Sequence, residues 1–141
     1  MLPLRFVRAW RTTSIALLVL VLAAALMPAV WLWPNRWDYV ARFDEIDKWL
    51  HGATFAFLAI WFAGQYRARS YWRIAFGLLC FGSLIEVVQR FVSYRSADWL
   101  DLAADAAGIS AGLLVALAGL GGWSLQVENR FAGPAGGPGR D

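Results

Sequence analysis

Four long apolar runs constrain this chain more than any other feature of its sequence. They cover about residues 15–33, 49–65, 74–92 and 101–123 of the 141 residues. A helix needs about 20 mostly apolar residues to cross the hydrocarbon core of a bilayer. Charged residues make up 16% of the chain, against about 25% in soluble domains. The sequence therefore predicts an all-α integral membrane bundle of four transmembrane helices, and it argues against a soluble enzyme.

Basic residues predict the orientation of this bundle. With four spans, eight Lys and Arg residues lie on the side of the termini and five on the other side. Cytoplasmic segments carry the excess of Lys and Arg, so both termini are predicted to be cytoplasmic. The predicted organisation is a cytoplasmic segment 1–14, a transmembrane domain 15–123 and a cytoplasmic, disordered tail 124–141. A cleaved signal peptide would begin in a similar way, but the first run continues to a Trp-rich end, which favours a retained span.

Polar side chains gather at the predicted outer ends of the second, third and fourth spans. Within each group the spacing is mostly three or four residues, which places the side chains on one face of a helix. Ionisable groups are costly in lipid, so these faces are expected to point toward one another. The predicted ligand-binding residues are Asp47, Lys48, His51, Glu86, Gln89, Arg90, Arg95, Asp98, Asp101 and Asp105.

Two functions remain open for this polar group. It could bind or process a ligand, with His51, Glu86 or Asp101 as candidate catalytic groups that move a proton. Alternatively, it only locks the bundle of a non-catalytic scaffold or accessory subunit. A metal site from His51, Glu86, Asp101 and Asp105 is the weaker interpretation, because the chain has no H-E-x-x-H motif. No metal and no cofactor are therefore predicted, and whether the chain is an enzyme stays open.

The net charge of +3 is modest, and the basic residues are read as topology signals, so no nucleic-acid partner is expected. The lipid bilayer is the expected partner, and a homo-oligomer stays open. Ala104, Gly108 and Gly112 form a ladder of small residues that predicts close helix packing.

Three short motifs resemble the VanZ-like family of small bacterial membrane proteins. They are D-K-W-L-H at 47–51, E-V-V-Q at 86–89 and R-S-A-D-W-L-D-L-A-A-D-A-A-G at 95–108. The family pattern reads D-K-x-x-H, E-x-x-Q and R-x-x-D-x-x-D-x-x-x-N-x-x-G, in the same order. Asp105 stands where the family has Asn, and Gly52 stands where an aromatic residue often follows the His.

The resemblance implies a multi-pass protein of the bacterial cytoplasmic (inner) membrane with a role in the cell envelope. The namesake of the family is linked to resistance to the glycopeptide teicoplanin. The expected ligand is therefore an envelope lipid or a glycopeptide-related molecule, bound at the polar group. The resemblance supplies no reaction.

Overall fold

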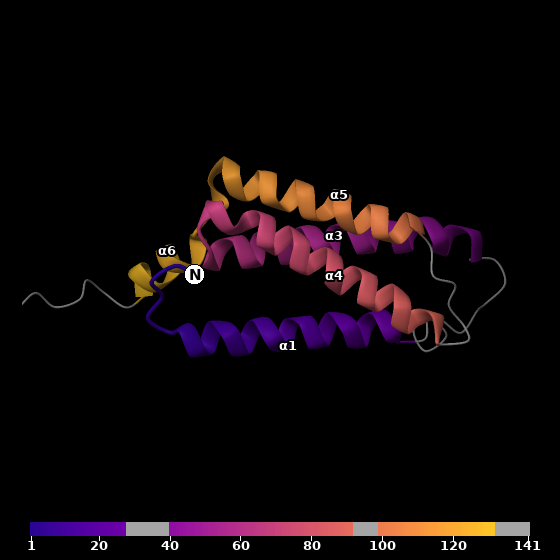
Figure 1. Cartoon of the computed structure of the whole chain (residues 1–141), viewed down its shortest axis with the longest axis horizontal. Coiled ribbons are helices and arrows are strands. Elements are labelled where there is room, and N and C mark those ends of the chain that lie inside the picture. The colour runs from indigo at the N-terminus through magenta and orange to yellow at the C-terminus, as the bar shows by residue number, and fades with distance from the viewer. Residues whose placement is uncertain (28–39, 92–98, 132–141) are drawn as a thin grey trace, which may run out of the picture.

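The computed structural model describes residues 1–27, 40–91 and 99–131, without the side chains of residues 40–47. Every regular element in these ranges is helical (Figure 1). The elements are α1 (Val7–Leu26), α3 (Val40–Gln65), the 3-10 turn η1 (Ala68–Ser70), α4 (Tyr71–Arg90), α5 (Trp99–Val115), the π-helical turn η2 (Ala116–Leu120) and α6 (Trp123–Phe131).

Three segments of the described residues are long and apolar enough to cross a membrane: Val7–Leu26, Ala68–Arg90 and Trp99–Leu120. The second predicted span, 49–65 in α3, does not meet these criteria, because Lys48, His51 and Gln65 lower the mean hydropathy of this helix. The bundle covers one face of α3, where Phe55, Leu58, Ala59 and Ala63 are buried, whereas Trp49, Leu50 and Phe57 are each at least 51% exposed. A helix face that packs against protein can carry polar residues that direct contact with lipid would disfavour.

Close packing of small residues holds α3 against α5. A Cβ atom at Gly108 would overlap the backbone of Gly52, and one at Gly112 would overlap the carbonyl oxygen of Ala56. The ladder of small residues is thus confirmed as a close helix contact, in which the absence of side chains lets two backbones approach. This contact sets the depth at which polar residues of the two helices face each other.

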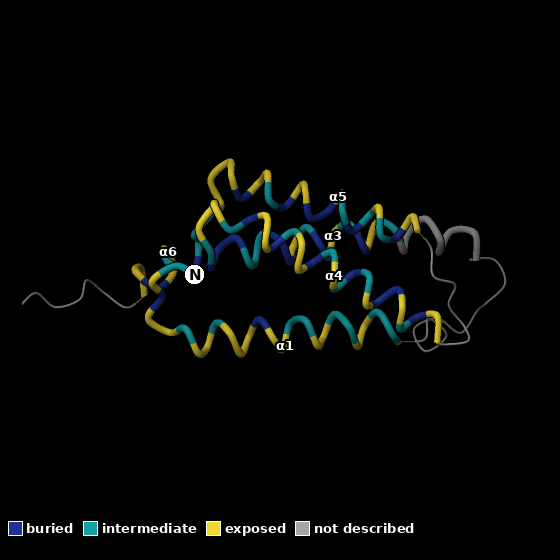
Figure 2. The backbone as a smooth tube through the Cα atoms, in the orientation of Figure 1, coloured by how far each residue is buried: buried dark blue, intermediate teal, exposed yellow. Residues whose placement is uncertain are grey.

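Helix α1 lies along the other side of the bundle and is mostly exposed (Figure 2). Ser14 is its one buried residue, whereas Ile15, Val19 and Leu20 are each at least 59% exposed. Such an apolar, uncovered surface is consistent with contact to membrane lipid.

The predicted boundaries need two corrections. Helix α1 begins at Val7, within the segment 1–14 that was predicted to precede the first span. Its Arg8 and Arg11 are exposed, and long arginine side chains can reach the interface from a helix end. Residues 124–131 belong to α6 and not to a disordered tail, because Ser124 and Glu128 are buried against the rest of the chain.

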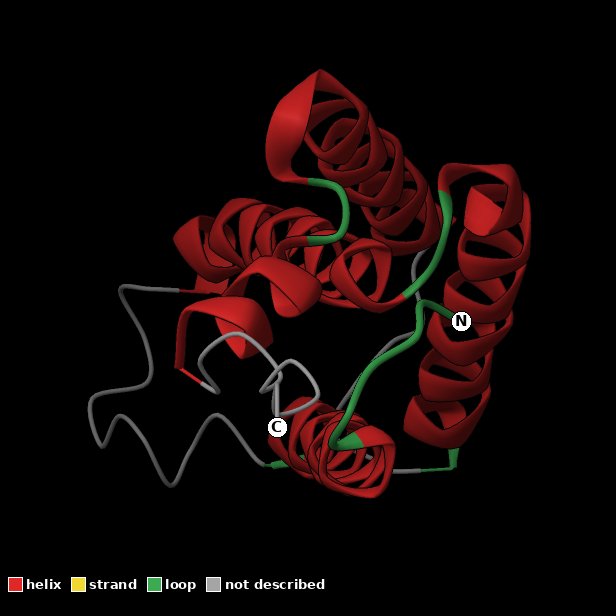
Figure 3. Ribbon diagram, turned by 90° about the vertical axis from the view of Figure 1, so that its left-hand side faces the viewer, coloured by secondary structure: helices red, strands yellow, loops and turns green. Residues whose placement is uncertain are grey.

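Successive helices run in opposite directions along the bundle, so the described N-terminal and C-terminal segments lie at the same end of it. The amide of Leu2 donates a hydrogen bond to the carbonyl of Gln65 at 2.8 Å, and α6 lies beside the start of α1 (Figures 1 and 3). Gly119 and Gly122 have φ values of 145° and 73°, a region that favours glycine, where the chain turns from α5 into α6. The opposite end holds the end of α1, the end of α4 and the start of α5.

Candidate functional site

Four ionisable side chains from three helices are buried toward the end of the bundle opposite α6. His51 lies on α3, Glu86 on α4, and Asp101 and Asp105 on α5. Their exposed fractions are 9%, 7%, 7% and 0%. We call these four residues the acidic cluster. Burying three carboxylates and one imidazole costs free energy.

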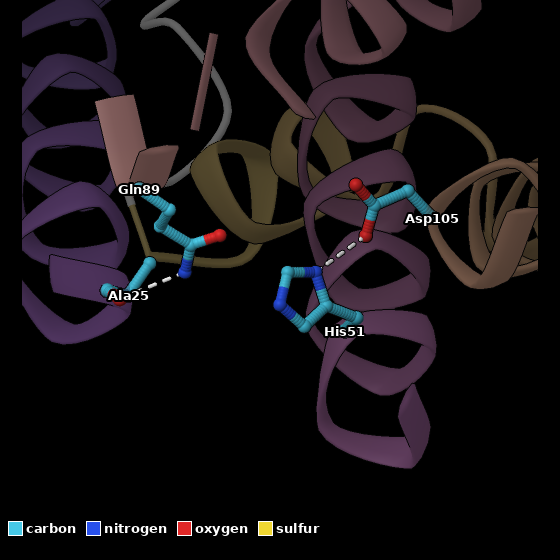
Figure 4. Close-up of polar contacts among 4 residues, drawn as sticks. All are labelled: Ala25, His51, Gln89 and Asp105. Carbon is cyan, nitrogen blue, oxygen red and sulfur yellow. Dashed lines mark hydrogen bonds and ion pairs between the residues drawn. The ribbon is translucent and has the colours of Figure 1, made fainter. Parts of the chain in front are cut away.

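His51 and Asp105 form a direct pair across the α3–α5 contact. The Nδ1 atom of His51 lies 3.0 Å from Oδ1 of Asp105 (Figure 4). With Asp105 ionised, its carboxylate only accepts hydrogen bonds, and Nδ1 of His51 would carry the proton and donate. The bond fixes the orientation of the ring and leaves the lone pair on Nε2. In Figure 4 the second ring nitrogen points away from Asp105.

Glu86 and Asp101 complete the cluster around His51. One ligand-type atom from each of His51, Glu86 and Asp101 lies within 4.8 Å of the other two. Glu86 comes from the last turns of α4 and Asp101 from the first turn of α5. The structure therefore brings together three residues that are far apart in the sequence.

A glycine on α4 makes room for the Asp105 carboxylate. A Cβ atom at Gly82 would overlap Oδ2 of Asp105. This oxygen is buried, and it has no hydrogen-bond partner among the described residues. Gly82 lies one turn before Glu86, so the second oxygen of Asp105 faces the same helix that carries Glu86.

Gln89 has a different role from the other buried polar residues at this end. Its Nε2 donates a hydrogen bond of 3.0 Å to the carbonyl of Ala25, close to the end of α1 (Figure 4). The last carbonyls of a helix have no partner within the helix, so a side-chain donor stabilises them. Gln89 thus links α4 to α1.

Of the five remaining predicted site residues, the structure describes the side chains of two. Lys48 is half-buried and Arg90 is exposed at the end of α4. The side chain of Asp47, and all of Arg95 and Asp98, lie outside the described residues.

A second buried polar group lies at the other end of the bundle, and the sequence analysis missed it. Glu128 of α6 accepts hydrogen bonds from the backbone N–H groups of Arg5 and Phe6 and from the indole of Trp10, at 2.6, 3.0 and 2.8 Å. Burial raises the pKa of the Glu128 carboxyl, but these three donors and the charge of Arg5 outweigh it and hold the pKa below its ordinary value.

Helices α1 and α3 meet near the same end through further polar side chains. The Ser14 hydroxyl accepts hydrogen bonds from the Trp61 indole and the Gln65 amide, at 3.0 and 3.1 Å. The rings of Trp10, Trp61 and Trp123 pack together with centroids 5.4–5.6 Å apart. We call Ser14, Gln65, Glu128 and these three tryptophans the terminal network. Glu128 is the only acidic residue between Asp105 and Asp141 in the sequence, and this isolation was the available signal.

Two surface hollows lie away from the acidic cluster. One of about 390 Å³ is lined by residues of α1 and α6, including Trp10 and Glu128. Another of about 320 Å³ is lined mainly by apolar residues of α1, α3 and α4, such as Leu18, Phe62 and Leu78. Neither is lined by a residue of the acidic cluster, so the two hollows do not coincide with that cluster.

The described helices define an all-helical protein with three apolar helices of membrane-spanning length. A family model for VanZ/LLP1 matches residues 2–120, so the chain belongs to the VanZ/LLP1 family. The family and the three apolar helices together indicate a membrane protein. No curated protein and no solved structure matches the chain.

Proposed function

We propose that the chain is a multi-pass protein of the bacterial inner membrane that binds the polar headgroup of an envelope lipid, or a glycopeptide-related molecule, at the acidic cluster. The single observation that supports this proposal is the convergence of His51, Glu86 and Asp101 from three helices within 4.8 Å. Ionisable residues inside a membrane protein usually mark functional sites, because burying a charged group in the membrane costs free energy.

The proposed topology has four spans, with α3 crossing the membrane inside the bundle and both termini in the cytoplasm. The side-by-side packing of α3 with α5 supports a crossing of similar depth. The acidic cluster then faces the outer leaflet, where envelope lipids are assembled and modified. A reporter fused after α6 tests this arrangement. A reporter that is active only in the cytoplasm is expected, and activity outside the cytoplasmic membrane would contradict the model.

One observation favours the alternative of a scaffold whose polar groups only lock the bundle. Gln89 is engaged with the carbonyl of Ala25, which is a structural role. The same interpretation extended to Glu86 and Asp101 predicts that their amide variants lose stability and keep their lipids. The ligand site predicts the reverse.

Mass spectrometry of lipids that co-purify with the intact chain tests the proposed function. The wild-type chain is expected to enrich a lipid with a distinctive headgroup, and folded Asp101→Asn protein is expected to lose that enrichment. Glu128→Gln is the matched control, because it also changes a buried carboxylate to an amide, but at the opposite end. The same lipids on all three proteins would contradict the proposal and favour the scaffold.

A further inference from the structure

We infer that the acidic cluster holds one divalent transition-metal ion. The ligands are the Nε2 atom of His51 and the carboxylates of Glu86 and Asp101. Asp105 acts as a positioning residue that orients the imidazole. The inference rests on the proposed function, because the ion occupies the same site and would meet the headgroup there.

The first argument is the donor set. One imidazole and two carboxylates suit zinc and manganese, whereas Ca²⁺ and Mg²⁺ prefer oxygen ligands alone. One ring nitrogen of His51 and one carboxylate oxygen from each of Glu86 and Asp101 lie within 4.8 Å of one another. Ligands about 2.0–2.2 Å from a tetrahedral zinc ion lie roughly 3.3–3.5 Å apart. Small side-chain rotations would therefore close the three ligands onto an ion.

The second argument is the His51–Asp105 hydrogen bond. A histidine that binds a metal through one ring nitrogen usually donates the other N–H to a carboxylate, which fixes the tautomer and the ring orientation. Asp105 accepts such a bond from Nδ1 at 3.0 Å. It is fully buried, and its Oδ2 atom has no hydrogen-bond partner among the described residues, so it lies beside the cluster as an additional acceptor.

The third argument is charge. The two ionised carboxylate ligands match the charge of a divalent ion, which offsets much of the cost of burying Glu86 and Asp101, while Asp105 keeps its own negative charge beside the imidazole. The ion also reconciles an acidic site with an anionic headgroup, since an open coordination position can accept a phosphate oxygen. The sequence carried no short metal motif because each ligand comes from a different helix.

Metal analysis of the full chain in detergent is the first test, with a purification tag that contains no histidine. The wild-type protein is expected to retain about one Zn²⁺ per chain, and excess Ca²⁺ is expected not to displace it. Glu86→Gln and Asp101→Asn are each expected to weaken Zn²⁺ binding at least tenfold. Asp105→Asn is expected to weaken it by about 10–100-fold while leaving one ion at saturation. Glu128→Gln is the control that keeps the wild-type affinity, and equal affinities in all variants would overturn the inference.

A spectroscopic test on the wild-type chain does not depend on how well the variants fold. His51 is the chain's single histidine, so selective ¹⁵N-histidine labelling reports on this ring alone. One equivalent of Zn²⁺ is expected to shift the Nε2 resonance strongly while Nδ1 keeps its proton. An unchanged spectrum overturns the metal site, and a zinc-dependent shift at Nδ1 overturns the role of Asp105.

Lipid analysis of zinc-loaded and chelator-treated protein separates this inference from the proposed function. Specific lipid on a chain that binds no zinc overturns the metal site only. Zinc on a chain that enriches no lipid overturns the proposed headgroup ligand only. Loss of the lipid on chelation supports both.

Discussion

Glu86 and Glu128 are both buried carboxylates, at 7% and 5% exposure, and they lie toward opposite ends of one helix bundle. Glu128 is surrounded by hydrogen-bond donors: two backbone N–H groups and an indole. Glu86 lies instead beside a second carboxylate, Asp101, and the imidazole of His51. The difference indicates that burial alone does not identify a functional acid. The different groups that surround the two acids are the reason why we propose a binding site at Glu86 and not at Glu128.

Helices α3 and α5 pack against each other between the two ends of the bundle. A substitution that disrupts this contact should therefore destabilise both ends. Gly108→Ala is expected to lower the free energy of unfolding by about 3 kcal/mol, because its Cβ would overlap the backbone of Gly52, which cannot rotate away. Chemical unfolding in detergent, followed by tryptophan fluorescence, measures this loss. Gly77→Ala is the matched control, since nothing lies within 4 Å of its Cβ position. It is expected to be neutral or to stabilise α4 by up to about 1 kcal/mol. Equal losses in both variants would contradict the close contact.

A pair of identical substitutions compares the two ends directly. Glu128→Gln is expected to cost about 2 kcal/mol, because charge-assisted hydrogen bonds to Arg5, Phe6 and Trp10 are weakened or lost. Glu86→Gln in metal-free protein is expected to cost less than about 1 kcal/mol, because it removes one negative charge from a cluster of acids. The same unfolding measurement, with a chelator present, gives both values. A larger loss for Glu86→Gln would show that the acidic cluster is the structural lock.

Acid pH should sharpen the comparison through a smaller effect. The folded chain holds the pKa of Glu128 below its unfolded value of about 4.3, so the carboxylate stabilises the fold above that pH. This contribution is lost as the pH falls through the lowered pKa of the folded state. The stability difference between wild type and Glu128→Gln is therefore expected to shrink between about pH 5 and about pH 3, as measured by unfolding at each pH. A difference that stays constant over this range would contradict the role of the Glu128 charge.

Local patterns predicted the parts of the structure that a single helix can decide. The helical content and the approximate positions of the helices followed from long apolar runs. The inward direction of Glu86, Asp101 and Asp105 followed from spacing of three to four residues along a helix. The family followed from three spaced motifs, and the family match over residues 2–120 confirmed it. The small residues at 104, 108 and 112 were correctly predicted as a packing surface.

Features that depend on two or more elements were wrong or missed. Residues 124–131 of α6 were predicted to belong to a disordered tail. Their burial was missed because it depends on a contact between Glu128 and the start of the chain, which is far away in the sequence. Gln89 stays a predicted ligand-binding residue, but the hydrogen bond from its amide to the carbonyl of Ala25 in α1 was missed. Helix α3 was predicted as an apolar span, whereas it is not among the three helices that are apolar enough, and its neighbours bury the face that carries His51.

The sequence by itself determined an apolar, helical chain of the VanZ/LLP1 family with ionisable residues at particular helix positions. These properties depend on hydropathy and on the 3.6-residue period, which act over one or two turns of chain. Only the tertiary structure decided that His51 pairs with Asp105, that Glu86 and Asp101 join them, and that Glu128 contacts the start of α1. The physical reason is that these contacts depend on how closely and at what depth whole helices pack, and that is settled by side chains far apart in the sequence.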